Sequence, residues 1–404
     1  MTIKKTSLLM LMLLLSQQFW TIKIGLVSIP MIALMLAAII SYKQILRFNI
    51  FVYIVIAYLA ISATYHAKQW ESEYIQYTPF FTFLALIFWW FSIALLLELK
   101  DRDYESALKR IAPYCIVVAF IGVIMNSPMS IATPMDGEMG FFNEKGLFGY
   151  YISILSCVVF VYSRRRIGWI VLLISIIYSV YIIGSSRSLL IYASLLVLYF
   201  ENINIKKSIN FSVGSLFLIG ILYFGGALDE TLGKLQIIQE NSGVIGRYAA
   251  TFTVTQLALP DILFGTGFGT YLDTRSLYVD VLPELPYDYA GSFLLEMIVE
   301  IGIVQTTLLY LGLTKLLFNK VSFSLFMVVM MLTLTGGKQD LQMLFGLIIF
   351  SLIYKSIAKY RVLGIFTQKS RGWLWLRSAS TSLPLARGEH YPSKADAMSA
   401  RFME

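Results

Sequence analysis

Histidine and cysteine are nearly absent from this sequence of 404 residues, which holds two of each. Cys115 and Cys157 both lie inside apolar stretches, so we expect two buried small hydrophobic residues and no disulfide. No spacing of His, Cys and Asp is typical of a metal site, and no Ser/His/Asp arrangement is visible. The phosphate loop GxxxxGKS or GxxxxGKT is also missing, so ATP-driven work has no support. The sequence predicts neither a metal ion nor a cofactor.

Charge is scarce as well, because 14% of the residues are charged and 58% are hydrophobic. The mean hydropathy is +0.73. A soluble domain of this length cannot bury so much apolar surface, since a core grows more slowly than its chain. Lipid is therefore the predicted solvent for most of the protein. The net charge of +8 is compatible with nucleic-acid binding, but in a membrane protein it more often reflects basic cytoplasmic loops, and we expect no nucleic-acid partner.

Apolar stretches of about the length that a membrane helix needs, roughly 20 residues, recur along the chain. We predict an all-α polytopic membrane protein with about twelve transmembrane helices and one large, partly helical loop on the outer side. The predicted spans are approximately 6–20, 24–41, 48–65, 79–98, 110–126, 146–162, 167–184, 187–201, 209–226, 289–314, 321–336 and 340–355. The first two are joined only by "QQFWTIK" and are alternatively one broken hairpin.

Lysine and arginine alternate between the two sides of this arrangement. With the N-terminus inside, every inner connection holds at least two cations, such as Lys4 and Lys5 before the first span. Positive charge favours the cytoplasmic side, so both termini are predicted to be cytoplasmic. The resulting divisions are 1–226 with helices 1–9, 227–288 as the large outer loop, 289–360 with helices 10–12, and 361–404 as a cytoplasmic tail that is alternatively in part an appended segment.

The outer loop at 227–288 is too rich in Ile, Leu, Phe and Tyr for a disordered linker. A long loop of this composition predicts an ordered cap. Within it, "RYAATFTVTQLAL" has helical potential before Pro260, and "FGTGFGTY" is a glycine-punctuated turn.

Arg187 lies in "IIGSSRSLLIY", on the side of the membrane where cations are rare. The apolar run after it, Leu189–Phe200, gives about 18 Å of helix, whereas the hydrocarbon core is about 30 Å thick. We therefore expect the helix to begin within "GSSRS" and Arg187 to lie at outer-leaflet depth. Lys338, between two short apolar runs, is expected at the same depth. Such cations either face a wet cavity or a partner anion, or they snorkel to lipid headgroups.

Three further cations, Lys145, Arg247 and Arg275, lie in the long outer connections. With the two cations above they are candidates to line one outer cavity at the membrane boundary. Arginine offers a planar fork of donors that suits phosphate, so this cavity would suit a ligand with an apolar tail and a pyrophosphate head. For Arg275, an ion pair with Asp273 is the alternative interpretation.

Three carboxylates belong to the same region. Asp288 precedes the span at 289–314, and Glu296 and Glu300 lie inside it at i and i+4, on one helix face. Carboxylates within a membrane segment indicate a functional site by default. The alternative is that they pair with the outer cations and hold helices together.

Four segments, in this order, resemble the O-antigen polymerase and O-antigen ligase superfamily of bacterial envelope glycosyltransferases. They are "GFFNEKGLFGYY", where Asn143 leads into a span; "IIGSSRSLLI", with Arg187 as the motif arginine; "GRYAATFTVTQLALPDILFGTGFGTY", with Arg247 as the loop arginine and Gly265, Gly267 and Gly269 as the glycines; and "AGSFLLEMIVEIGIVQ", with its Glu-x-Gly step.

The resemblance implies a GT-C-like polymerase that joins oligosaccharide repeat units carried on undecaprenyl pyrophosphate. The reaction would take place at the periplasmic face of the bacterial inner membrane, as a metal-independent, inverting transfer. The family's ligases have a histidine where this chain has Ala290 or the nearby Asp288, which favours the polymerase. The alternatives are an O-antigen ligase and a lipid-linked oligosaccharide flippase or other transporter. A chain-length regulator and a flippase are the implied protein partners.

In this interpretation arginines neutralise the leaving pyrophosphate, and a carboxylate orients or deprotonates the acceptor hydroxyl. The expected catalytic residues are Arg187, Arg247, Asp288, Glu296 and Glu300. The expected substrate-binding residues are Asn143, Lys145, Tyr248, Gly265, Gly267, Arg275 and Lys338.

Overall fold

The computed structural model describes 4–20, 22–24, 27–45, 47, 53, 57, 61, 78–126, 142, 145–201, 242–277, 292–334, 336–337 and 340–362. At 78–83, 125–126, 145, 165, 186, 200, 242–248 and 360–362 only the backbone is described. The chain divides into two compact units, Met1–Ile357 and Ala358–Glu404, and the first contains the elements discussed below.

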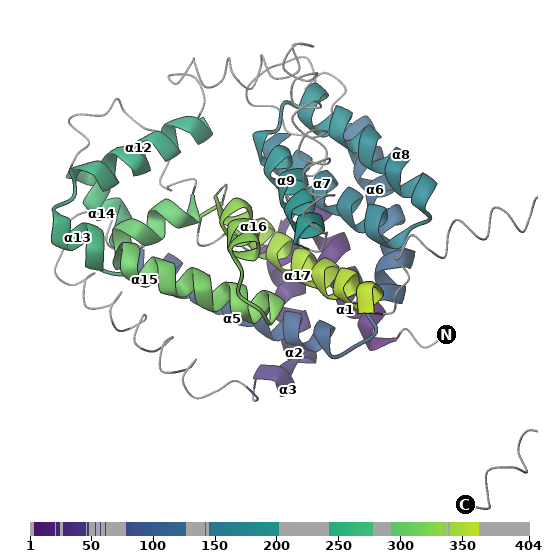
Figure 1. Ribbon diagram of the computed structural model, residues 1–404, viewed down its shortest axis with the longest axis horizontal. Helices are drawn as coiled ribbons and strands as arrows, with labels where there is room; N and C mark the ends of the chain where they lie inside the picture. The colour runs from purple at the N-terminus through teal and green to yellow at the C-terminus, as the bar shows by residue number, and fades with distance from the viewer. Residues whose placement is uncertain are drawn as a thin grey trace, which may run out of the picture. The chain divides into compact units, whose positions relative to one another are not determined.

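The described residues are almost entirely helical, which confirms the predicted all-α class (Figure 1). The first half holds α1 (Lys5–Leu15), the 3-10 turn η1 (Ser16–Phe19), α2 (Ile29–Ile40), α3 (Tyr42–Ile45), α5 (Thr78–Lys100), α6 (Glu105–Asn126), α7 (Lys145–Tyr162), α8 (Arg165–Ile176), the π-helical turn η3 (Ile177–Ile182) and α9 (Ser186–Phe200). The second half holds α12 (Ser242–Gln256), α13 (Leu259–Phe264), α14 (Tyr271–Ser276), α15 (Phe293–Phe318), α16 (Phe323–Thr333) and α17 (Leu341–Val362).

The predicted segment 24–41 is helical only in its second part. Two-residue strands, β1 (Lys23–Ile24) and β2 (Val27–Ser28), pair antiparallel before α2 begins. The prediction of one helix from residue 24 was therefore wrong. Pro30 accounts for the later start, because proline is well accommodated in the first turn of a helix, where its missing N–H has no intrahelical partner.

Three helices in the described part of the chain are long and apolar enough to cross a membrane: Glu105–Ile124, Phe293–Phe318 and Leu341–Lys359. Five shorter apolar helices accompany them. The predicted spans 48–65 and 209–226 lie outside the continuously described residues, and the count of twelve stays a prediction.

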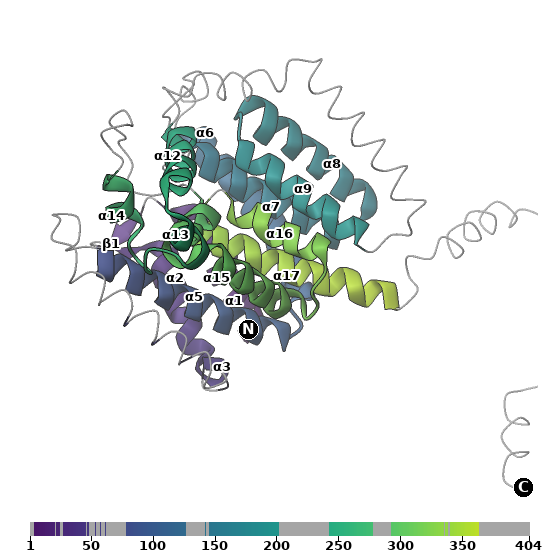
Figure 2. The same ribbon diagram turned by 60° about the vertical axis from the view of Figure 1, so that its left-hand side comes forward.

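The packing centres on α7, which lies against α6, α8 and α9 (Figure 2). The α16 helix joins α9 to α15. Cys115 and Cys157 are both fully buried in this core and are free thiols, as predicted. The side chains on the other sides of α6 and α8 are apolar and exposed, among them Tyr114, Ile124 and Ile174. Exposed apolar faces of this extent are unusual in soluble monomers, and they are typical of surfaces that lipid covers.

Helix ends that the charge pattern predicts to be inside meet at one end of the bundle. Glu98, at the end of α5, is buried. Its carboxylate forms ion pairs with Lys5 Nζ at 2.9 Å and with the Arg102 guanidinium at 2.7 Å. On another pair of elements, Lys320 Nζ lies 2.7 Å from a carboxylate oxygen of Glu201. The pairs Lys5–Glu98 and Lys320–Glu201 connect segments far apart in the sequence, whereas Glu98 and Arg102 are four residues apart.

The same end of the bundle holds the C-terminus of α15. Lys100 Nζ donates to the carbonyl oxygens of Leu316 at 3.0 Å and Leu317 at 2.6 Å. A cation there is stabilised by the helix dipole and satisfies carbonyls that lack intrahelical donors. Lys355 Nζ donates in turn to the Lys100 carbonyl. The beginning of α1 and the later part of α17 therefore both contact the region around the α5–α6 turn, as the predicted topology requires.

Candidate functional site

The helix α15 is broken at Gly302, within the segment predicted as a continuous span. Gly302 has φ 78° and ψ 164°, a conformation open to glycine alone. In a continuous helix the carbonyls of Val299 and Glu300 would accept from residues 303 and 304. Here Thr266 N donates to the Val299 carbonyl at 2.9 Å, and Gly267 N donates to the Glu300 carbonyl at 2.8 Å. The loop after α13 therefore replaces the hydrogen bonds that the break removes.

Two glycines make this docking possible because the two backbones touch directly. A Cβ on Gly265 would overlap the Glu300 carbonyl, and a Cβ on Gly302 would overlap the carbonyl of Leu263. Gly265 has φ 85° and Gly267 has φ 122°, so both also need the conformational freedom of glycine. The glycine-punctuated turn predicted from the sequence is confirmed, and its glycines shape the backbone around the Glu300 carbonyl.

The break places Glu296 and Glu300 against α14. Both side chains are buried on the same side of α15, as their spacing predicted. Tyr271 N donates to Glu300 Oε1 at 3.4 Å. The Tyr271 side chain also feels the charges of Arg275 and Glu296. The carboxylate cluster, as we call it below, consists of Tyr271, Arg275, Glu296 and Glu300.

Tyr271 lies at the centre of the carboxylate cluster. Its hydroxyl is buried and has no hydrogen-bond partner among the described residues. Burial raises the pKa of this phenol, Arg275 opposes that shift, and the negative charges of Glu296 and Glu300 reinforce it. The phenol is therefore a neutral donor at physiological pH. A buried tyrosine hydroxyl usually finds a partner, so this one is available to a bound ligand.

The turn before α17 borders the cluster. A Cβ on Gly337 would lie 3.6 Å from Glu296 Oε2. Three residues later Asp340 caps α17, because its Oδ1 accepts from Gln342 N at 2.8 Å and from Met343 N at 3.3 Å. Gly337 thus lies directly beside a carboxylate of the cluster, one residue before the predicted Lys338, which is itself outside the described residues.

Arg187 lies in the first turn of α9, which begins at Ser186 with Ser185 as its cap. This start confirms the prediction that the helix begins within "GSSRS". The Tyr150 side chain on α7 feels the charges of both Arg187 and Asp340. Its hydroxyl is buried, with no hydrogen-bond partner among the described residues. Arg187 and Asp340 therefore both lie within electrostatic range of Tyr150, and Asp340 directly precedes α17.

The structure thus groups Glu296, Glu300 and Arg275 around Tyr271, and it places Arg187 within electrostatic range of Tyr150. The remaining predicted residues are not tested by side-chain positions. Lys145, Arg247 and Tyr248 lie in helices whose backbone alone is described there, and Asn143, Asp288 and Lys338 lie outside the described residues.

Sequence reasoning missed Tyr271, Tyr150 and the break at Gly302. The break had a signal, since Gly302 belongs to the Glu-x-Gly step already noted. The tyrosines had none, because a tyrosine in an apolar segment is usually a core residue. Among the residues that the structure describes, no group of three or more His, Cys, Asp or Glu side chains could hold a metal ion.

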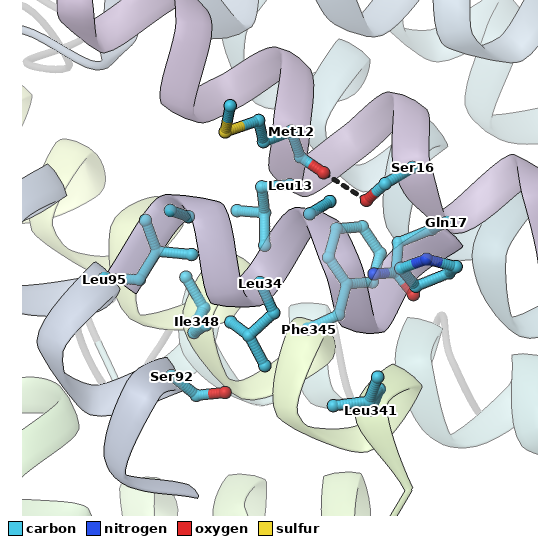
Figure 3. Close-up of a pocket in the computed structure, with 13 residues that line it drawn as sticks. Met12, Leu13, Ser16, Gln17, Leu34, Ser92, Leu95, Leu341, Phe345 and Ile348 are labelled. Carbon is cyan, nitrogen blue, oxygen red and sulfur yellow. Dashed lines mark hydrogen bonds between the residues drawn. The ribbon is translucent and has the colours of Figure 1, made fainter. Parts of the chain in front are cut away.

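A small pocket lies elsewhere, between α1, α2, α5 and α17 (Figure 3). Its lining is mostly apolar, with Ser16, Gln17 and Ser92 as polar members. The cavity measures about 20 Å³, which is room for about one water molecule. None of the predicted site residues lines it, and it is too small to hold the expected substrate.

No family model, curated protein or solved structure matches this chain.

Proposed function

We propose that this protein is a membrane-embedded polymerase of lipid-linked oligosaccharides. It would join repeat units carried on undecaprenyl pyrophosphate at the periplasmic face of the bacterial inner membrane, with both termini in the cytoplasm and about twelve spans. The observation that carries the proposal is the carboxylate cluster around the break in α15. It contains two buried glutamates, an arginine and a tyrosine hydroxyl that has no hydrogen-bond partner in the described part of the chain. Two segments that resemble the polymerase and ligase superfamily meet at this break.

The cluster suits an inverting glycosyl transfer. The oxygen of the acceptor hydroxyl would attack the anomeric carbon of the donor sugar, and the bond from that carbon to the pyrophosphate oxygen would break. Glu296 or Glu300 would take the proton of the acceptor hydroxyl. Arg275, together with Arg187 and Arg247, would stabilise the charge that develops on the leaving undecaprenyl pyrophosphate. Tyr271 would donate a hydrogen bond to the same group or to a sugar oxygen.

The burial of the two glutamates favours this role. Burial fixes both side chains beside the break, where a carboxylate oxygen can orient a bound acceptor hydroxyl. An acceptor hydroxyl is a weak acid and needs a base or a close orienting group. The positive charge of Arg275 partly compensates the negative charge of the two glutamates.

A lipid-linked oligosaccharide transporter is the second candidate, and one observation favours it. Broken helices with irregular backbone at membrane depth are typical of transporter binding sites. The break at Gly302 has this form. An O-antigen ligase fits the cluster less well, because this chain has Ala290 where the family's ligases have a histidine.

The decisive experiment is polymerisation by the purified protein in detergent micelles. Lipid-linked repeat units are added, and products are separated by gel electrophoresis. A polymerase produces a ladder without any membrane to cross, whereas a transporter leaves single units. In cells, deletion of the gene should leave single-repeat products; accumulated lipid-linked polymer would instead indicate a ligase, and an unchanged ladder would contradict both enzymes.

Two arginine variants test the leaving-group role. Arg187→Ala and Arg247→Ala should each abolish the ladder while the protein stays folded. Lysine at either position should also perform poorly if bidentate phosphate binding is the reason for arginine. Full-length chains from either alanine variant would contradict the role given to that arginine.

A further inference from the structure

The depth of the break in α15 can be derived from helix geometry. Lys315 and Lys320 mark one polar boundary of the span, near its end at Phe318. From Gly302 to Phe318 the helix rises about 24 Å at 1.5 Å per residue. The hydrocarbon core is about 30 Å thick, and tilting shortens the vertical rise further. Gly302 therefore lies inside the core or at its outer edge, and not in the aqueous phase beyond it.

The short helix α13 is fixed at the same depth. The carbonyl of Leu263 lies directly against Gly302, so the two backbones cannot be separated along the membrane normal. Residues 259–264 belong to the loop that the sequence predicted to be a cap outside the membrane. The docking onto Gly302 instead brings this part of the loop down to the lipid.

The outer surface of α13 is apolar. Leu259 is 69% exposed and Phe264 is 63% exposed. The adjoining face of α15 is similar, because Ile303, Val304 and Leu308 are exposed as well. The apolar surface of a candidate membrane span thus continues onto α13. Asp261, the one charged residue in the sequence of α13, is partly buried.

The backbone around α13 also meets the requirement of a low-dielectric environment, where unsatisfied N–H and C=O groups are costly. Ile262 N donates to the Ala258 carbonyl at 3.0 Å, and Gly265 N donates to the Asp261 carbonyl at 2.7 Å. The next two N–H groups of the loop bond to α15 across the break. Irregular backbone is tolerated at membrane depth when it is bonded to protein in this way.

We propose that α13 is a membrane-contacting segment, with Leu259 and Phe264 inserted into the outer part of the bilayer beside α15. The partner of this surface is the acyl chain region just below the lipid headgroups. The proposal does not depend on glycosyl transfer. If the protein does act on a lipid-linked substrate, the α13–α15 corner is where the bilayer comes closest to the carboxylate cluster.

The test uses three variants of the full-length protein, each with one introduced cysteine that carries a fluorophore. The variants are placed in vesicles of phosphatidylethanolamine and phosphatidylglycerol. Phe264→Cys carries the fluorophore at the test position. Leu308→Cys is the control for lipid contact, since it is exposed on the span, and Thr255→Cys is the aqueous control, since it is exposed on α12. The native Cys115 and Cys157 are buried, and the labelled wild type measures their background.

Lipids with a nitroxide near the headgroup should quench the label at 264, and lipids with a nitroxide deeper on the acyl chain should quench the label at 308, which lies about 9 Å further into the core than Gly302. They should leave the label at 255 nearly unaffected. A label at 264 that is quenched by aqueous iodide, or that neither reagent reaches because protein covers it, would overturn the proposal. Failure of the lipid to quench position 308 would overturn the depth argument and the proposal with it. Leu259→Cys repeats the test if Phe264→Cys does not fold.

Discussion

The charged and polar side chains at the two ends of the helix bundle differ in how fully they are partnered. At the end with Lys100, the charged groups are matched by short contacts, as with Glu98 between Lys5 and Arg102. At the other end, Glu296 and Glu300 are buried as well, and the tyrosine hydroxyl beside them has no hydrogen-bond partner among the described residues. At the first end the carboxylate of Glu98 has two cationic partners, whereas the cluster at the second end leaves the hydrogen-bonding capacity of the Tyr271 hydroxyl unused among the described residues. Stability explains the first arrangement, and the second needs a function to explain it.

The largest expected effect separates the two kinds of carboxylate by activity. Glu300→Gln keeps the shape of the side chain and removes its charge, so it should lower the polymerisation rate by about 100-fold or more if Glu300 is the base or orients the acceptor. Glu98→Gln is the matched control, because Glu98 is also buried but lies at the other end. The rate per folded protein should be unchanged there. Equal rates for the two variants would remove the distinction drawn above.

The next effect concerns the glycine pair at the break. Gly302→Ala combines an unfavourable φ with overlap of backbone atoms, so it should destabilise the protein by about 3 kcal/mol or prevent folding. Gly312→Ala is the control on the same helix, since nothing lies within 4 Å of its added Cβ. That change should be neutral or stabilise by up to about 1 kcal/mol. Chemical unfolding curves in mixed micelles measure both, and similar curves for the two would show that the docking is unimportant.

A smaller effect is expected at the end of the bundle that holds Lys100 and Glu98. Glu98→Gln should destabilise the protein by about 1–2 kcal/mol, less than the ~3–5 kcal/mol for a fully buried pair, because Lys5 and Arg102 are partly exposed. Lys320→Gln, which breaks the more exposed pair with Glu201, should cost less than about 1 kcal/mol. The same unfolding measurement decides the order, and a larger loss from Lys320→Gln would contradict it.

A further expected effect is a dependence of stability on pH. Burial, with a further contribution from Lys355, lowers the pKa of Lys100 to about 8. The unfolded chain keeps the ordinary lysine pKa of about 10.4 and therefore binds more protons between these two values. The unfolding free energy should then rise from pH 8 to pH 10, and Lys100→Met should show a flatter profile. A wild-type profile that falls in this window would mean that the helix carbonyls stabilise the ammonium more than burial destabilises it.

Local patterns in the sequence predicted much of what the structure shows. The start of α9, the shared face of the two glutamates and the buried cysteines all follow from short-range spacing and composition. The hairpin at β1 and β2 and the break in α15 did not follow. Both halves of α15 keep an apolar composition, so hydropathy cannot register the break. It depends on N–H donors at Thr266 and Gly267, more than thirty residues earlier in the chain, and only the folded structure brings these together.

The docking of the loop after α13 onto the break at Gly302 also bears on the order in which the helices assemble during biosynthesis. The loop that supplies the two N–H donors precedes α15 in the chain, so it has already left the ribosome when α15 is made. No later segment is needed to complete these hydrogen bonds. The kink can therefore form as soon as α15 enters the bilayer, and α16 and α17 assemble against a helix that already has its final bend.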